Sequence, residues 1–100
     1  MDIFENEFKD IAIISGNTYL FQSTDAVDVI KKCKELNIKI LGVESFEIYE
    51  NKRKPIMEGI FDCSIDGKIE GYWSEAIHFI QVLQNQIQNQ GLVFEIIYEL

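Results

Sequence analysis

The stretch LNIKILGVESFEIYENKRKP, residues 36–55, decides the fold of this chain. Apolar residues recur at alternate positions from Ile38 to Ile48, which predicts a strand with one buried side. Glu44 falls in the middle of that apolar face. Because burying an unpaired carboxylate costs several kcal/mol, the sequence disfavours a flat and fully covered strand. Two alternatives remain: a bend or bulge around Gly42 turns Glu44 outward, or Glu44 lies at the mouth of a site.

The residues before this stretch predict an amphipathic helix that begins near Ser23 or Thr24 and stops at Asn37. Aspartates near its start and lysines near its end suit the helix dipole. Farther upstream, residues 11–14 and 18–21 predict two short strands around a turn. The apolar stripe of the helix consists of Ala26, Val29, Ile30, Cys33 and Leu36.

The residues after the stretch predict three further elements. A polar turn over residues 50–54 leads to an antiparallel strand over 57–65, because the connection is short. A second amphipathic helix spans 74–90, and Gly91 is placed to end it. Residues 92–100 are apolar on both faces, which predicts an interior strand.

Together these elements predict a single α+β domain over residues 1–100. We expect a two-layer sandwich, with two helices on one face of a mostly antiparallel sheet of three or more strands. The other face of the sheet would then carry the alternate positions of the strands. These positions are acidic, at Glu47, Glu95 and Glu99, with Glu58 and Asp62 as further members.

The composition limits the classes of partner. Seventeen acidic residues against nine basic residues give a formal net charge of −8. Nucleic acid and anionic membranes would be repelled, whereas a basic protein would be attracted. The acidic start of the sequence is unlike a signal peptide, and no apolar run approaches membrane-spanning length, so we expect a cytoplasmic protein. Cys33 and Cys63 are expected to be reduced and buried.

The sequence holds no recognisable catalytic motif. It has no glycine-rich phosphate loop, no metal-spaced cluster and no nucleophile with a histidine base, so we expect no enzyme activity, cofactor or metal. An acid–base pair of Glu44 and Asp62 is the one catalytic alternative. His78, the single histidine, falls on a polar helical face. Trp73 either anchors a partner or packs the start of the second helix against the core.

The segment DAVDVIKKCKELNIKILGVESFEI, residues 25–48, is an amphipathic helix that leads into a strand with the residues Ile40-Leu41-Gly42-Val43-Glu44. It resembles small immunity proteins of bacterial polymorphic toxin systems, one family of which has Ile-Leu-Gly-Gly-Asp-Val-Tyr in this strand. A tryptophan before a helix and an apolar last strand recur as well, so the resemblance covers about residues 24–100. Val43 and Ser45-Phe46 depart from the pattern.

This resemblance implies a protein that binds and neutralises a cognate toxin without catalysis. A basic, nuclease-like toxin would suit the acidic composition. The alternative is a regulatory or adaptor domain that binds a small molecule or a peptide; a deep apolar pocket around Glu44 would favour it. We predict that the partner-binding residues are Glu44, Glu47, Tyr49, Trp73, Glu95 and Glu99.

Overall fold

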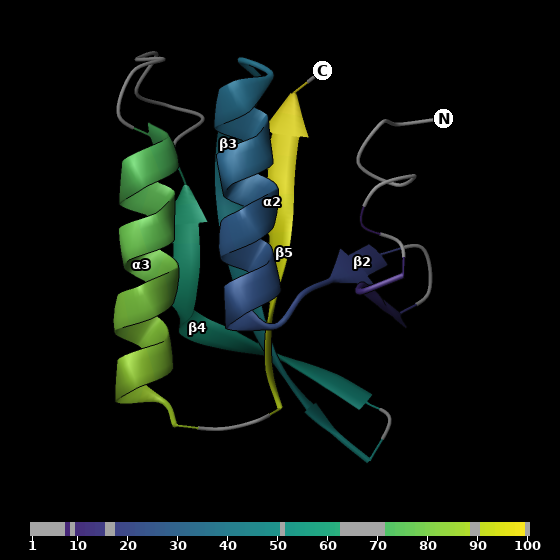
Figure 1. The fold of residues 1–100 in the computed structure, drawn as a ribbon. Coiled ribbons are helices and arrows are strands. Elements are labelled where there is room, and N and C mark those ends of the chain that lie inside the picture. Colours follow the sequence, from purple (N-terminus) through teal and green to yellow (C-terminus); the bar gives the residue numbers. More distant parts are fainter. Residues whose placement is uncertain are drawn as a thin grey trace.

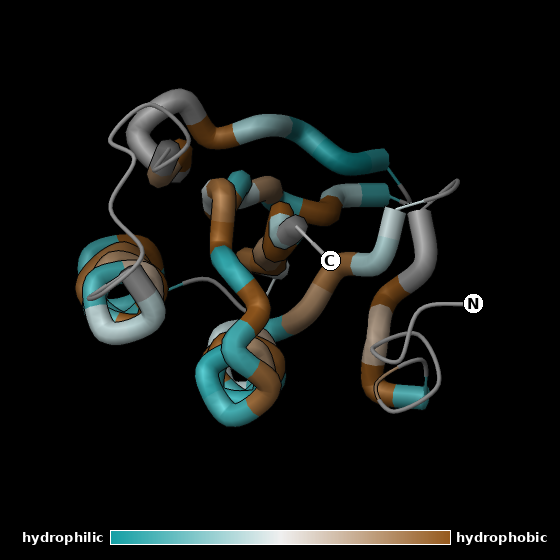
Figure 2. Tube along the Cα trace, turned by 90° about the horizontal axis from the view of Figure 1, so that it is seen from above, coloured by the Kyte–Doolittle hydropathy of each residue, from teal (hydrophilic) through white to brown (hydrophobic). Residues whose placement is uncertain are grey.

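The computed structural model describes residues 8, 10–15, 18–50, 52–62, 72–88 and 91–99. The predicted α+β arrangement is confirmed, because both helices pack on the same face of a mostly antiparallel sheet (Figure 1). Seen from above, the helices form one layer and the strands the other (Figure 2). The elements are β1 (Ile13–Ser15), β2 (Thr18–Leu20), α2 (Ser23–Glu35), β3 (Lys39–Tyr49), β4 (Lys52–Asp62), α3 (Tyr72–Gln86) and β5 (Leu92–Glu99).

The main sheet has the strand order β4-β3-β5, and both pairings are antiparallel. Its long central strand is β3, which lies within residues 36–55. Phe21, just after β2, exchanges two backbone hydrogen bonds of 2.8 Å with Phe94 of β5. This pairing makes the end of β2 a fourth member of the sheet, so β5 lies between β3 and the Phe21 segment. The two short N-terminal strands also form as predicted, as the antiparallel pair β1–β2.

The register of β3 is interrupted twice. Against β5, Ile40 pairs with Tyr98 and Gly42 pairs with Ile97, so Leu41 is an extra residue that forms a bulge. Against β4, the pairing jumps from Glu44↔Ile60 to Phe46↔Pro55, which leaves four residues of β4 opposite one of β3. Below this second interruption the β3–β4 hairpin twists away from the helices (Figure 1).

Two apolar clusters hold the layers together. The larger one lies between the helices and the sheet, and its fully buried members include Ile30 of α2, Ile80 of α3 and Phe94 of β5. The smaller one comprises Leu20, Phe46 and Val93, with Ile13 and Ile48 packed against them. Since Phe46 and Val93 alternate with residues of the larger cluster, the smaller cluster lies on the sheet face away from the helices.

The helix ends follow the predictions in part. The N-cap of α2 is Gln22, one residue before Ser23, the first of the two predicted caps. Gln22 makes no side-chain capping bond. Asn37 has a left-handed φ of 56°, and its amide bonds to the carbonyl of Lys34, so it ends the helix as predicted. Helix α3 begins at Tyr72 and ends at Gln86, earlier at both ends than the predicted 74–90.

The prediction of a polar turn over residues 50–54 was wrong, because β4 begins at Lys52. Glu50, with a φ of 51°, lies in the turn itself. Cys33 is buried and is not part of a disulfide, as predicted. Cys63 lies outside the described residues.

The buried hydroxyl of Ser45 yields a test of the core. Its Oγ has no hydrogen-bond partner in the part of the chain that the structure describes, and the residue is 1% exposed. We expect Ser45→Ala to leave the free energy of unfolding unchanged or to raise it by up to about 1 kcal/mol, because an unpaired polar group is removed. Urea denaturation measures this, with Ile40→Ala as a control that loses about 2–5 kcal/mol. A loss above about 1 kcal/mol for Ser45→Ala would mean that the hydroxyl has a partner.

Candidate functional site

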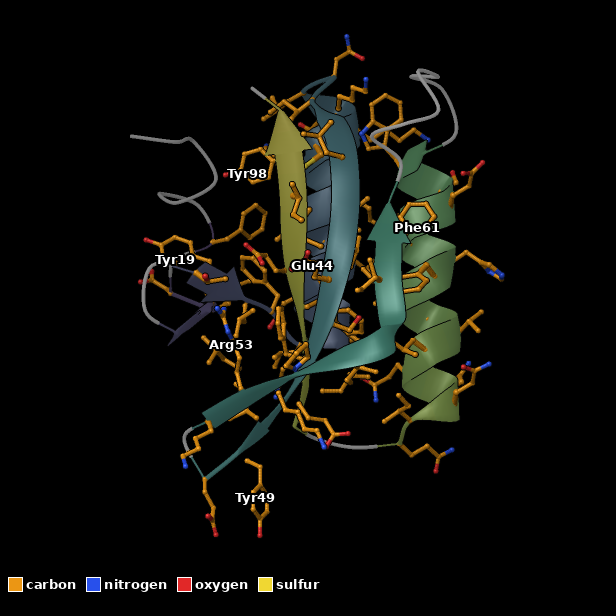
Figure 3. All side chains as sticks on the ribbon, turned by 180° about the vertical axis from the view of Figure 1, so that it is seen from behind. Tyr19, Glu44, Tyr49, Arg53, Phe61 and Tyr98 are labelled. Carbon is orange, nitrogen blue, oxygen red and sulfur yellow. The ribbon has the colours of Figure 1, made fainter. Side chains whose placement is uncertain are left out.

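The bulge at Leu41 places Glu44 on the sheet face away from the helices. Val43 belongs to the helix-side core, so its neighbour Glu44 projects from the opposite side. Figure 3, which views this side, shows Glu44 in the middle of the sheet. Its side chain is half-buried. Of the two alternatives for Glu44, the bulge that turns it outward is confirmed.

Glu44 lies directly opposite Glu95 of β5. Like charges at directly opposed positions of neighbouring strands repel each other. The pKa of Glu95 is raised above its ordinary value of 4.5, first because the side chain is partly buried and second because Glu44 is close; Arg53 acts in the opposite direction. The free chain thus holds two carboxylates together against their mutual repulsion, with incomplete compensation from one cation.

An aromatic ring and a guanidinium lie next to this pair. Phe46 is two residues after Glu44, so both project from the same face. The Arg53 guanidinium carbon lies 4.8 Å from the centre of the Phe46 ring, within the range of a cation–π contact. Arg53 is itself exposed and pairs across the hairpin with Ile48. Because its register partner Ile48 packs with Phe46, Arg53 takes a position on the same sheet face as Glu44.

We call Glu44, Glu95, Phe46 and Arg53 the open-face site. Glu99, at an even spacing from Glu95, takes a position on the same face of β5, opposite Lys39. The structure therefore brings together two of the six predicted binding residues, Glu44 and Glu95; Glu99 is four residues farther along β5.

The prediction that Glu47 shares this face was wrong. Glu47 is three residues after Glu44, an odd spacing in a strand, so the two side chains leave β3 on opposite faces. The bulge at Leu41 reversed the faces of every later residue in the strand. Glu47 is half-buried and lies opposite Lys54 of β4. The side chains of Glu58 and Asp62, the other expected members of the acidic face, lie outside the described part of the chain.

The two predicted aromatic anchors lie at opposite ends of the molecule. Tyr49 is 73% exposed at the tip of the β3–β4 hairpin (Figure 3). Trp73 is half-buried at the start of α3, and its indole Nε1 donates a 2.9 Å hydrogen bond to the carbonyl of Ile38. Trp73 therefore ties α3 to the residue before β3, which is the structural role that the sequence left open. Tyr49 is the anchor that is free to contact a partner.

Arg53 and Phe46 were not predicted as site residues. The sequence signal was present, since Phe46 shares the alternation of Glu44 and Arg53 is two residues before Pro55. Placing them required two facts about register: β4 begins at Lys52, and its first residues pair with the end of β3. The prediction of a polar turn over these residues concealed that pairing.

Three hollows on the described surface lie away from Glu44. Two adjoining ones, of about 480 and 650 Å³, lie between the start of α2 and the end of α3, and they share Ser23, Thr24, Gln84 and Asn85. The third, of about 500 Å³, is lined by Phe61 and by residues of α3. Glu44 lines none of the three, so they do not supply the deep pocket around Glu44 that the ligand-binding alternative would favour.

Searches of the described residues found no group of three or more His, Cys, Asp or Glu side chains that would hold a metal ion. None of the described helices is both long enough and apolar enough to cross a membrane. No protein-family model matches the sequence, and neither a curated protein nor a solved structure matches it significantly. The assignment of a function therefore depends on the geometry of the open-face site and on the sequence resemblance.

The raised pKa of Glu95 predicts a pH-dependent penalty on stability. In the unfolded chain the Glu95 carboxyl loses its proton near pH 4.5, whereas in the folded chain it keeps the proton to a higher pH. As pH rises from 4.5 through the raised pKa of the folded state, Glu95 therefore lowers the free energy of unfolding. We expect Glu95→Gln to be more stable than the natural chain, by a margin that grows from pH 4.5 upward. Thermal unfolding between pH 4 and 8 measures the margin.

Glu47→Gln is the matched control, because it removes a carboxylate from the opposite face of the same sheet. A margin for Glu95→Gln that stays constant with pH, or that shrinks as pH rises, would contradict the raised pKa of Glu95.

Proposed function

We propose that this chain is a non-catalytic binding protein that neutralises a basic partner protein, as an immunity protein does with the toxin of its own cell. The observation that supports this most is the pair Glu44 and Glu95 on the face away from the helices. The amphipathic helix and the strand of residues 25–48, which resemble the immunity family, lead directly into that face.

The energetics of the pair favour a cationic partner. In the free chain the two carboxylates repel each other, and the burial of Glu95 adds to the cost of ionising it. A positive group placed between them would remove the repulsion on binding. The interaction is then more favourable in the complex than in the free chain, which is the property of a binding residue rather than of a stabilising one.

The net charge of −8 supports the same proposal through kinetics. A basic partner would be steered toward the chain, which raises the association rate and makes it sensitive to salt. Tyr49, exposed at the hairpin tip, supplies an aromatic side chain of the kind that slows dissociation. In this proposal the chain acts in the cytoplasm of the cell that makes the toxin.

A ligand-binding adaptor domain is the second candidate, and the joined hollows between α2 and α3 support it. Their lining is mostly uncharged and polar, with Gln81, Gln84, Asn85 and Gln88 from the end of α3 and the residues that follow it. Such a lining would suit a polar ligand. This candidate gives no role to the Glu44–Glu95 pair, and we therefore favour the binding of a basic protein.

The test needs a candidate toxin domain, which is to be sought at the C-terminus of a large secreted protein encoded next to this gene. Binding kinetics are measured for Glu95→Lys and for Glu47→Lys, which make the same charge change on opposite faces of the sheet. We expect Glu95→Lys to lower the association rate about tenfold or more at low salt and to flatten its salt dependence. Glu47→Lys should have the smaller effect of net charge alone.

Tyr49→Ala tests the anchor separately. We expect a faster dissociation rate with little change in association, because a contact at the hairpin tip forms only after encounter. Equal association rates for the natural chain, Glu95→Lys and Glu47→Lys would show that the open-face site does not attract the partner. Absence of binding by the natural chain would refute inhibition of that toxin.

A further inference from the structure

Arg53 is the one cationic residue of the open-face site, and it lies beside the two carboxylates that would bind a cation of a partner. Its guanidinium contacts the Phe46 ring at 4.8 Å, and its charge acts on Glu95. Among the described residues, however, Arg53 forms no ion pair with Glu44 or Glu95; the ion pair described in the chain joins Lys32 to Glu35. The carboxylates are therefore close enough to attract a guanidinium, and the one that is present does not engage them directly.

The surroundings of this contact are those of a guanidinium site. Phe46 forms the floor and is 7% exposed, and the buried Val93 and Leu20 hold it in place. Glu44 is two residues along the same face of β3, and Glu95 is opposite Glu44. A rigid aromatic ring beside two carboxylates offers a planar cation a surface for stacking and acceptors for its N–H groups.

We propose that Phe46, Glu44 and Glu95 form an arginine-binding site, which Arg53 occupies in the free chain and which an arginine of the basic partner occupies in the complex. This inference rests on the proposed function, because it names the partner group that the open face receives. The exchange forms and breaks no covalent bond; one guanidinium replaces another over the same ring.

The site favours arginine over lysine. A guanidinium is planar and presents several N–H donors in one plane, so one that enters from outside can stack on the ring with its N–H groups turned toward the carboxylates. An ammonium group is a compact charge that lacks this plane. The site therefore selects for the type of basic residue as well as for positive charge.

Arg53 is able to leave without disturbing the fold. Its side chain is exposed, and its place in β4 is held by the register with β3, where it pairs with Ile48. While Arg53 is in place, the site is available to another guanidinium only for part of the time. The apparent affinity for a partner arginine is reduced by that fraction, and removing Arg53 restores it.

The test compares Arg53→Gln with Lys54→Gln. The two positions are adjacent and lose the same charge, but Lys54 points to the opposite face, opposite Glu47. The probes are blocked hexa-arginine and hexalysine peptides, titrated against the full chain while the backbone amide signals of residues 44–46 and 93–95 are followed by NMR. The spectrum of each variant also reports whether it is folded.

We expect hexa-arginine to bind the natural chain more tightly than hexalysine and to shift these signals. Arg53→Gln should tighten hexa-arginine binding at least about threefold more than Lys54→Gln does, because it vacates the site. Glu95→Gln should weaken the binding. Arg53→Lys keeps the charge and loses the planar group. Its affinity for hexa-arginine should lie between those of the natural chain and Arg53→Gln.

Equal tightening by Arg53→Gln and Lys54→Gln would overturn the inference, since net charge would then explain both. Equal binding of the two peptides, or weaker hexa-arginine binding by Arg53→Gln, would also overturn it. The peptide titration needs no toxin, so the two proposals fail separately. A chain with this arginine site that binds no toxin refutes the proposed function, and toxin binding without the Arg53 effect refutes the site.

Discussion

The extra residue Leu41 in β3 is the constraint on which the rest of the structure depends. It has no partner on β5, so the alternation of side chains reverses at that point of the central strand. Ile40 before the bulge and Val43 after it both reach the helix-side core, where each is fully buried. Without the bulge, Glu44 would face that core. A single residue thus makes the strand compatible both with an apolar helix layer and with a carboxylate in its middle.

The same reversal also carries a cost in stability. By turning Glu44 outward, the bulge sets it opposite Glu95, where two carboxylates repel each other and one is partly buried. The small cluster of Leu20, Phe46 and Val93 packs immediately beside the pair on the same face. Arg53 relieves part of the repulsion from the other side of the hairpin. An arrangement of this kind stores an unfavourable interaction that a cationic partner would remove.

Much of the fold could be predicted from the sequence, because apolar periodicity located the helices and strands of the described residues in outline, although β4 begins five residues earlier than predicted. Asn37 ended α2 as expected, and an outward bulge was one of the two alternatives for Glu44. The face of Glu47 could not be predicted, because period-2 counting assumes an unbroken register and an extra residue reverses it. Arg53 was missed because Lys52, Arg53 and Lys54 have the composition of a turn, yet charged residues and proline are also what an edge strand such as β4 tolerates.

The central claim is that the bulge places Glu44 and Glu95 at directly opposite positions of β3 and β5, where they repel each other. A double-mutant cycle tests it most directly. Urea denaturation at neutral pH is measured for the natural chain, Glu44→Gln, Glu95→Gln and the double variant. We predict that the double variant gains less stability than the sum of the two single gains, by up to about 1 kcal/mol, since either substitution alone removes the repulsion. Strictly additive effects, or single substitutions that each destabilise the chain, would contradict the account.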